Sequence, residues 1–190
     1  MKPIDPYLLA LAEHQAVFEQ LRGLSSAVDT LAKRLADAIA KGHKIMFCGN
    51  GGSAADSQHL AAELTGRLVY DRPSIGGMAL STDSSALTCI GNDYGFEQIF
   101  ARQVAGLGQA GDVLVAISTS GNSENVIQAV HAAHAKGIAT VGLLGHDGGK
   151  LLALCQHCLV VPSPTTARIQ EAHIFLGHNL CAGIERYLGY

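Results

Sequence analysis

Apolar and polar positions alternate with the period of an α-helix at the start of the chain. One such stretch runs from Leu8 to Leu21, and a second runs from Val28 to Ile39. Gly23 separates the two stretches and Gly42 ends the second, as expected at helix termini. Two helices ahead of the first strand are more than a minimal sheet needs, so they are candidates for a subunit interface.

From residue 43 onward, short apolar runs alternate with helical patterns. The predicted strands are Lys44–Cys48, Met78–Ser81, Asp112–Ile117, Thr140–Leu144 and Cys158–Val161. The predicted helices are Ser53–Gly66, Ser84–Ile90, Phe96–Leu107, Glu124–Lys136 and Thr166–Leu188, with a short helix between the last two strands. This alternation predicts an α/β fold, a three-layer doubly wound sandwich whose mainly parallel sheet has about five strands. We expect one domain over 1–190, with a helical segment at 1–42 and an α/β core at 43–190.

Composition narrows the classes of protein to which the chain can belong. Hydrophobic residues make up 48% of the chain and charged residues 15%, which excludes a disordered chain and is compatible with surface buried in an oligomer. The net charge is −3 and no basic run occurs, so we expect no nucleic-acid partner. The apolar runs are shorter than the roughly 20 residues that span a bilayer, and acids and prolines interrupt the N-terminus. We therefore expect no membrane partner and a cytoplasmic location.

The cysteines are odd in number and scattered. There are five of them, mainly within apolar stretches, which is typical of reduced core residues rather than of a disulfide framework. Cys155 and Cys158 have the spacing of a metal-binding or redox pair, but no second pair follows and no thioredoxin-like context surrounds them. We interpret them as structural.

A glycine-rich turn, Gly49–Ala54 (GNGGSA), follows the first predicted strand and precedes a helix. Glycines there let backbone N–H groups approach an anion, and the helix N-terminus adds favourable partial charge. The same residues match G-x-G-x-x-A, the dinucleotide fingerprint, which requires an acidic residue at the end of the second strand about 20 residues on. Asp71 has that separation but precedes the strand, and Asp83 lies too far along. The fingerprint therefore lacks its partner.

A second polar turn, Ser118–Ser123 (STSGNS), joins the third predicted strand to the next helix. A helix N-cap would need only one Ser or Thr, whereas this turn holds four hydroxyl groups and a glycine. We therefore interpret it as an anion-binding turn. In an open α/β sheet both turns lie at the carboxyl ends of strands, where ligands bind.

The helix after the first turn carries His59 and Glu63, four residues apart and hence on one face. Such a pair can bind a divalent metal or transfer protons, and it can also be an ordinary polar pair on a solvated face. Its place on the helix that the glycine turn opens favours a functional role.

Two further pairs of polar residues are candidates. Gln170 and His178 lie about 80° apart around the final helix and about 12 Å apart along it. One small ligand can hardly contact both from a straight helix, so either the helix bends or one of them joins a site through another subunit. Asn92 and Asp93 are either a turn or a hydroxyl-binding pair.

These motifs together resemble those of the SIS family of sugar-phosphate isomerases, and within it the phosphoheptose isomerases. The stretches that carry the resemblance are CGNGGSAADSQHLAAELTGR, DRPS, TCIGNDYGFEQIFARQV, GDVLVAISTSGNSENVI and RIQEAH…GH. They extend over nearly the whole chain from Lys44 to His178, and the family also has helices ahead of this region. The resemblance implies the SIS fold.

The resemblance also implies a role for each matching residue. Substrate contacts would come from Asn50, Gly51, Gly52, Ser53, Glu63, Asn92, Asp93 and Gln170, and the phosphate would be held by Ser118, Thr119, Ser120 and Ser123. One Zn²⁺ per subunit would be bound by His59, Glu63, Gln170 and His178. Glu63 and His178 would also act as catalytic acid and base. The family is typically a homotetramer with active sites between subunits.

The expected reaction is aldose–ketose isomerisation of D-sedoheptulose 7-phosphate to D-glycero-D-manno-heptose 7-phosphate through an enediol(ate), in ADP- or GDP-heptose and lipopolysaccharide biosynthesis. Proton transfer between two carbons needs a base, a group that shuttles hydroxyl protons and charge stabilisation. Alternatives are a non-catalytic SIS protein that binds a replication initiator, and an isomerase of another sugar phosphate. The presence of Glu63 favours the enzyme, since we expect non-catalytic relatives to lack that carboxylate.

Overall fold

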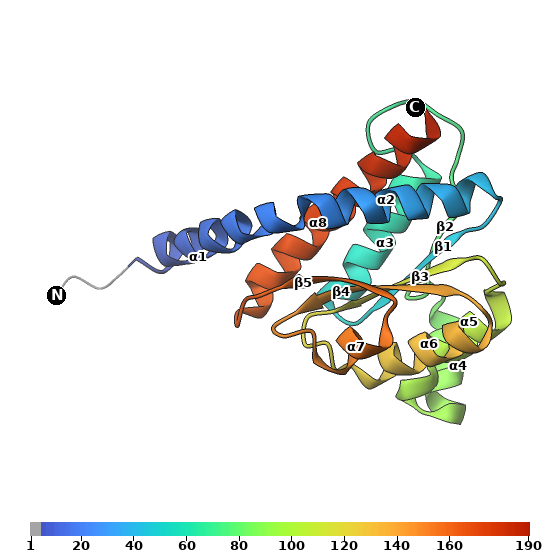
Figure 1. Cartoon of the computed structure of the whole chain (residues 1–190). Coiled ribbons are helices and arrows are strands. Elements are labelled where there is room, and N and C mark those ends of the chain that lie inside the picture. Colours follow the sequence, from blue (N-terminus) through green and yellow to red (C-terminus); the bar gives the residue numbers. More distant parts are fainter. Residues whose placement is uncertain (1–4) are drawn as a thin grey trace.

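Five parallel strands form a sheet at the centre of the molecule (Figure 1). The structure is a computed structural model that describes residues 5–190. The strands are β1 (Ile45–Gly49), β2 (Gly77–Ala79), β3 (Val113–Ser118), β4 (Ala139–Gly145) and β5 (His157–Val161). They lie in the order β2-β1-β3-β4-β5, each parallel to its neighbours. Their nearly continuous apolar sequences suit strands that are covered on both faces.

Helices cover the two faces of the sheet (Figure 1). One layer contains α1 (Pro6–Gln20), α2 (Ser25–Ala40), α3 (Gly52–Thr65) and α8 (Thr166–Leu188). The other contains α4 (Ser84–Tyr94), α5 (Ala101–Leu107), α6 (Glu124–Ala135) and α7 (Gly149–Leu154). The prediction of a three-layer α/β sandwich with helices ahead of the sheet is confirmed.

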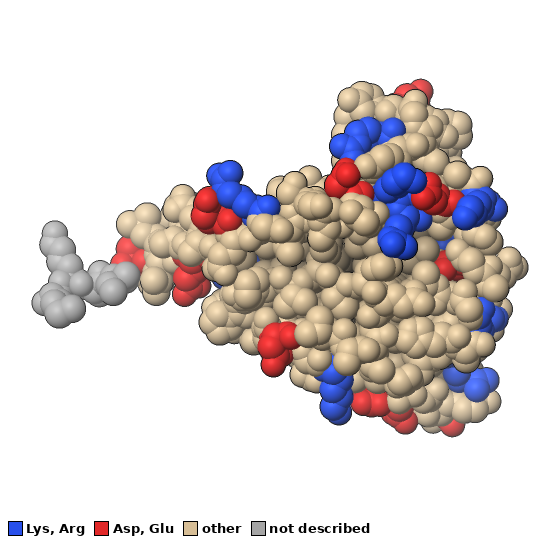
Figure 2. All heavy atoms as spheres, viewed as in Figure 1, with Lys and Arg blue, Asp and Glu red and all other residues tan. Residues whose placement is uncertain are grey.

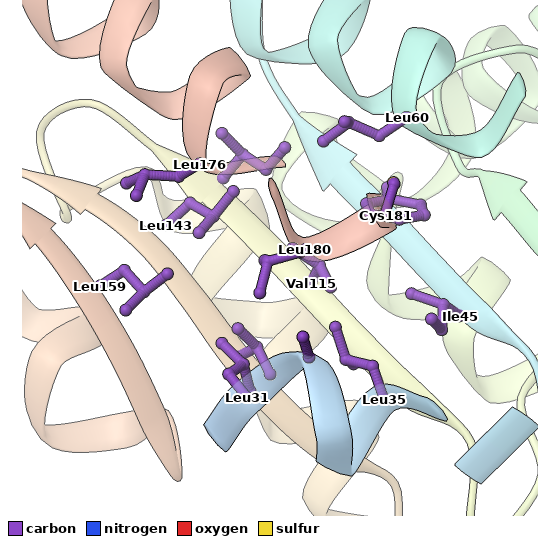
Figure 3. Close-up of a cluster of buried hydrophobic side chains, with 14 of the residues drawn as sticks. Leu31, Leu35, Ile45, Leu60, Val115, Leu143, Leu159, Leu176, Leu180 and Cys181 are labelled. Atoms are coloured by element: carbon purple, nitrogen blue, oxygen red, sulfur yellow. The ribbon is translucent and has the colours of Figure 1, made fainter. Parts of the chain in front are cut away.

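Alternate residues of each strand enter two separate hydrophobic cores. Ile45 and Phe47 of β1 pack in the core under α2, α3 and α8, whereas Met46 and Cys48 pack in the core under α5 and α6. The first core is drawn in Figure 3, where Leu60 of α3 lies across from α8 side chains such as Cys181. This packing holds α3 and α8 side by side on one face of the sheet.

The N-terminal helix α1 extends away from the body of the molecule (Figure 1). Its large apolar side chains include Tyr7, which is 72% exposed, and Leu8, which is 58% exposed. Arg168 of α8 donates a hydrogen bond to the Ala10 carbonyl at 2.6 Å and so ties this helix to α8. Few side chains of the protein are charged, and acidic and basic groups are interspersed on the face shown in Figure 2.

The structure differs from the predicted elements mainly around residue 95. Helix α4 continues to Tyr94, so Asn92 and Asp93 lie in its last turn, and the interpretation of these two residues as a loop turn is wrong. Gly95, with φ of 89°, ends that helix. The helix predicted over Phe96–Leu107 is a 3-10 turn at Phe96–Gln98 followed by α5, because the chain must turn after the glycine before it can pack on α6.

The cysteines are free, but they are not uniformly buried. Cys48, Cys155 and Cys181 are buried and Cys158 is partly buried, whereas Cys89 is exposed on α4. The prediction of core cysteines is therefore wrong for Cys89. Among the described residues, none of the helices combines the length and the apolar character that crossing a membrane requires.

Candidate active site

The sheet topology brings the two predicted anion-binding turns together. The chain leaves β1 toward β2 on one side and continues from β3 toward β4 on the other, so the strand order reverses between β1 and β3. These strands are neighbours, with Gly49 at the end of β1 in register with Ile117 of β3. Ligands of doubly wound sheets bind at such a switch point, beyond the carboxyl ends of the strands.

The first turn leads directly into α3. Gly51 precedes the helix with φ of 55°, a conformation that favours glycine. A Cβ on Gly52 would clash with the end of the Gln170 side chain, so the final helix reaches this turn and a larger residue here would require Gln170 to move. Gly51 and Gly52 are exposed and Ser53 is buried. The exposed N-terminus of α3 can therefore accept an anion.

A pair of amides joins the first turn to the second. The Asn50 side chain donates to the Asn125 amide oxygen, and the Asn125 side chain donates to the Asn50 amide oxygen, both at 2.8 Å. Asn125 is buried in the first turn of α6, directly after the second turn. This reciprocal pair fixes the separation of the two turns. Asn125 could not be predicted as a site residue, because nothing in the sequence around it indicates a contact with Asn50.

The second turn is rich in hydroxyl groups. The Ser118 and Ser123 hydroxyls lie 3.0 Å apart, and Ser120 Oγ accepts from the Asn122 N–H at 3.1 Å. Ser118 is buried, Thr119 and Ser123 are partly buried and Ser120 is exposed. Several donors thus surround a small volume at the N-terminus of α6, as an oxyanion requires.

Three side chains of α3 and α8 form a compact cluster. His59 Nε2 lies 3.2 Å from Glu63 Oε1 on α3 and 2.9 Å from Nε2 of His178 on α8. The ligand atoms of the three residues all lie within 4.8 Å of one another. Two imidazole nitrogens at this distance need a shared proton or a shared cation between them. The cluster is therefore able to bind a metal ion or to exchange protons with a ligand.

The close packing of α3 on α8 brings this cluster together. Gly177 precedes His178, and a Cβ at this position would lie 2.6 Å from the Leu60 side chain, which follows His59. The absence of a side chain at Gly177 lets the two helices approach beside the histidines. Sequence spacing could not predict this contact, because the two residues are far apart along the chain.

Gln170 lies toward the other end of α3. Its amide covers Gly52, and it also lowers the pKa of Asp56, although burial has the larger effect and raises that pKa above its ordinary value. Asp56 Oδ2 is buried and has no hydrogen-bond partner among residues 5–190. Gln170 and His178 thus face successive turns of the same helix. Asp56 was not among the predicted site residues, since an isolated acid on a helix carries no recognisable signal.

Comparison with known proteins identifies the family. The SIS domain family matches residues 11–145. A phosphoheptose isomerase from a Nitratiruptor species is 55% identical over 92% of this chain and 94% of its own length. A phosphoheptose isomerase of Maridesulfovibrio salexigens is 51% identical over 98% of this chain and 90% of its own. The chain belongs to the phosphoheptose isomerase family.

Solved structures of the family superimpose closely on this fold. The phosphoheptose isomerase of Neisseria gonorrhoeae has a TM-score of 0.90 at 47% identity and covers 95% of this chain and 97% of its own. That of Francisella tularensis has a TM-score of 0.91 at 35% identity and covers 98% of this chain and 100% of its own. The predicted resemblance and the prediction of a sugar-phosphate isomerase are confirmed.

In this member of the phosphoheptose isomerase family, the end of β2 does not supply the acidic residue that a dinucleotide fingerprint requires. Strand β2 ends at Ala79, and the nearest following acid, Asp83, accepts a hydrogen bond from the Ala86 N–H at 3.0 Å as the N-cap of α4. Its carboxylate thus stabilises the start of a helix. The glycine turn is therefore better explained by a sugar-phosphate ligand than by a nicotinamide cofactor.

Two predicted site residues, Asn92 and Asp93, lie apart from the other predicted site residues. The Asn92 amide donates to Asp93 at 2.7 Å, and both side chains are exposed on α4. Within residues 5–190 no hydrogen bond connects them to the two turns or to the His59, Glu63 and His178 cluster. Their contact with substrate stays a prediction.

Proposed function

We propose that the protein converts D-sedoheptulose 7-phosphate into D-glycero-D-manno-heptose 7-phosphate through an enediol(ate), and so supplies ADP- or GDP-heptose and lipopolysaccharide biosynthesis. One observation carries the proposal. The helix that begins at the glycine turn also bears His59 and Glu63, and α8 adds His178 to the same face. A phosphate bound at the Ser118–Ser123 turn, beside the start of α3, would therefore let the sugar extend along α3 toward a carboxylate and two imidazoles.

Binding would be divided between the two turns. Ser118, Thr119, Ser120 and Ser123 would hold the phosphate by hydroxyl and backbone hydrogen bonds. Asn50, Gly51, Gly52 and Ser53 would contact the sugar near the start of α3, with Gln170 above them and Asn92 and Asp93 as further partners for hydroxyl groups. Binding energy from the phosphate, which does not react, orients the carbons that do.

Proton transfer would be carried out by Glu63 and His178. A base that moves a proton between C1 and C2 must reach both carbons, and a carboxylate can do so without a change of position. The Glu63 side chain is 19% exposed, so it is accessible to a ligand yet partly shielded from water. His178 approaches from the opposite helix and is suited to move the proton between the two oxygens.

The cluster also fits a zinc ion. Two imidazole nitrogens and a carboxylate oxygen, all within 4.8 Å of one another, are the donor set of catalytic zinc sites, which keep a further position for substrate. The ligands would be His59, Glu63 and His178, whereas Gln170, the fourth predicted ligand, lies against Gly52 and would have to change position to reach the same ion. When bound, such an ion polarises a carbonyl oxygen and stabilises the negative charge that develops on it.

We also propose that the chain acts in the cytoplasm as a homotetramer whose active sites lie between subunits. The exposed apolar side chains of α1 support an oligomer. This helix projects from the body of the molecule, and its solvent-exposed leucines would be more stable if they were buried against another subunit. The division into one domain over 1–190, with a helical segment at 1–42 and a core at 43–190, stays a prediction.

A coupled assay with sedoheptulose 7-phosphate tests the proposed reaction. We expect turnover of the heptulose phosphate to exceed that of pentose and hexose phosphates, and we expect an exposed control, Asp37→Asn, to match the wild type. Failure of the wild type to isomerise any sugar phosphate, together with capture of a replication initiator, would favour the non-catalytic alternative.

Metal content is tested separately. We expect freshly purified protein to contain about one zinc ion per subunit, and His59→Gln to contain much less. Full activity after removal of all metal by a chelator would remove zinc from the proposal while leaving the isomerase in place.

A further inference from the structure

A buried arginine joins the end of α3 to α8. The Arg72 side chain is 0% exposed and lies in the segment between α3 and β2. Its Nε donates to Glu185 Oε1 of α8 at 2.8 Å, and its Nη2 donates to the Glu63 carbonyl at 2.7 Å. One guanidinium thus contacts both helices that carry the reactive cluster.

The carbonyl groups at the end of α3 need these contacts. The last carbonyls of a helix have no partner within it, and a cation beside them also stabilises the helix dipole. Arg72 serves the Glu63 carbonyl, and it also donates to the Leu64 carbonyl at 2.9 Å and to the Gly66 carbonyl at 3.3 Å. Its fork of donors therefore fixes the backbone of the residue whose side chain is the candidate base.

Glu185, the partner of Arg72, is also buried and accepts a second hydrogen bond. Glu185 is 1% exposed and also accepts from the Leu68 N–H at 3.2 Å. Burial alone would raise the pKa of the Glu185 carboxyl, but the bonds from Leu68 and Arg72 hold it below its ordinary value, so the pair is ionised. Glu185 lies seven residues after His178, two turns along the same side of α8.

We propose that Arg72 is a positioning residue for the isomerase reaction, which sets the separation of Glu63 from His178 by binding the Glu63 carbonyl and Glu185 together. This inference rests on the proposed function. It predicts that loss of Arg72 lowers kcat and leaves phosphate binding intact, because the two anion-binding turns lie at the other end of α3.

A paired substitution separates positioning from stability. Removal of one member of a buried ion pair leaves an unpaired charge, whereas replacement of both by apolar groups often leaves stability unchanged. We expect Arg72→Met alone to lower the thermal midpoint, and Arg72→Met with Glu185→Leu to recover most of it. The double variant still lacks a donor for the Glu63 carbonyl, so its kcat should stay about 10-fold to 100-fold below the wild type.

Two further variants complete the experiment. Arg72→Lys keeps the charge, but it replaces the planar fork that serves Glu185 and the Glu63, Leu64 and Gly66 carbonyls with one flexible ammonium group. Its kcat should therefore fall even if the double variant does not fold. Lys44→Met is the matched control, since Lys44 lies 2.6 Å from the buried Asp112 where β1 and β3 begin, in an ion pair that includes no predicted site residue. It should lower the thermal midpoint without lowering kcat in the folded protein.

The readouts are kcat, the thermal midpoint and the inhibition constant of inorganic phosphate. We expect that inhibition constant to stay within about twofold of the wild type in every Arg72 variant. The inference is overturned if Arg72→Lys and the double variant, or whichever of them folds, have wild-type kcat. A wild-type protein without isomerase activity would instead refute the proposed function.

Discussion

The two ends of α3 serve the candidate site by different means. At its amino end, a contiguous turn of glycines and a neighbouring turn of serines present backbone and hydroxyl groups to an anion. Toward its carboxyl end, His59 and Glu63 meet His178, and Arg72 and Glu185 hold the backbone there. The first end is suited to binding and the second to chemistry, so changes at the two ends should affect different kinetic constants.

The largest effect is expected at the chemical end of α3. In His178→Gln the side chain can no longer accept and donate a proton during turnover, so kcat should fall by about 10²-fold to 10⁴-fold. KM should change little, because the anion-binding turns are untouched. Steady-state kinetics measure both constants, and His131→Gln, an exposed histidine on α6, is the control. A kcat within about twofold of wild type would show that His178 has no part in proton transfer.

The stability of the folded protein should depend on pH through His173, which lies on α8 between Gln170 and His178. Burial lowers the pKa of His173 from 6.5 to about 4, and the Leu144 backbone opposes this shift only in part. The unfolded chain therefore takes up a proton first as the pH falls, and the folded state loses stability between about pH 6.5 and about pH 4. The loss should approach about 3 kcal/mol.

Denaturant unfolding across this range measures the effect, with His173→Phe as the comparison. The variant should lose this part of the pH dependence. An unchanged slope in His173→Phe would assign the acid sensitivity to other groups. The result also separates acid unfolding from a direct effect of pH on turnover.

At the binding end of α3, loss of one hydroxyl should weaken the phosphate contact without removing the chemistry. Ser123→Ala removes a partner of Ser118 and a donor to the phosphate, so KM should rise by about 10-fold, as for a hydrogen bond to a charged group worth about 1.5 kcal/mol. The inhibition constant of inorganic phosphate should rise in parallel. A loss confined to kcat would contradict the division between the two ends.

The smallest effect is expected from the amide pair that joins the two turns. Asn125→Ala leaves the partly buried Asn50 amide without its partner and should lower stability by about 1 kcal/mol while KM rises a few-fold. Gln128→Ala is the control on α6, because the Gln128 amide donates to Glu124 at 2.7 Å on the exposed face, away from Asn50. Equal effects of the two substitutions on KM would show that the pair does not set the spacing of the turns.

The sequence predicted the features that are local along the chain. Both turns are runs of six residues, and His59 and Glu63 share a helical face because of their spacing alone. Apolar periodicity predicted the strands and most helices, and the main error lies where Gly95 redirects the chain after α4.

Contacts between distant residues were beyond sequence reasoning. The meeting of His178 with His59 depends on Gly177 packing against Leu60, and the capping of α3 depends on Arg72 and Glu185, which lie over 100 positions apart. From their spacing on the final helix, we predicted that Gln170 and His178 could hardly contact the same small ligand. They are reconciled in part by α3, which runs beside α8 and faces Gln170 at Gly52 and His178 at His59.

Exchange of the substrate carbon proton with solvent tests most directly whether α3 separates binding from chemistry. In deuterated buffer, Glu63→Gln should bind sedoheptulose 7-phosphate with a Kd within about twofold of wild type, yet incorporate deuterium at C1 or C2 at less than about 1% of the wild-type rate. Calorimetry and NMR measure the two quantities on the same sample. Deuterium incorporation at the wild-type rate, or loss of binding together with exchange, would contradict the account.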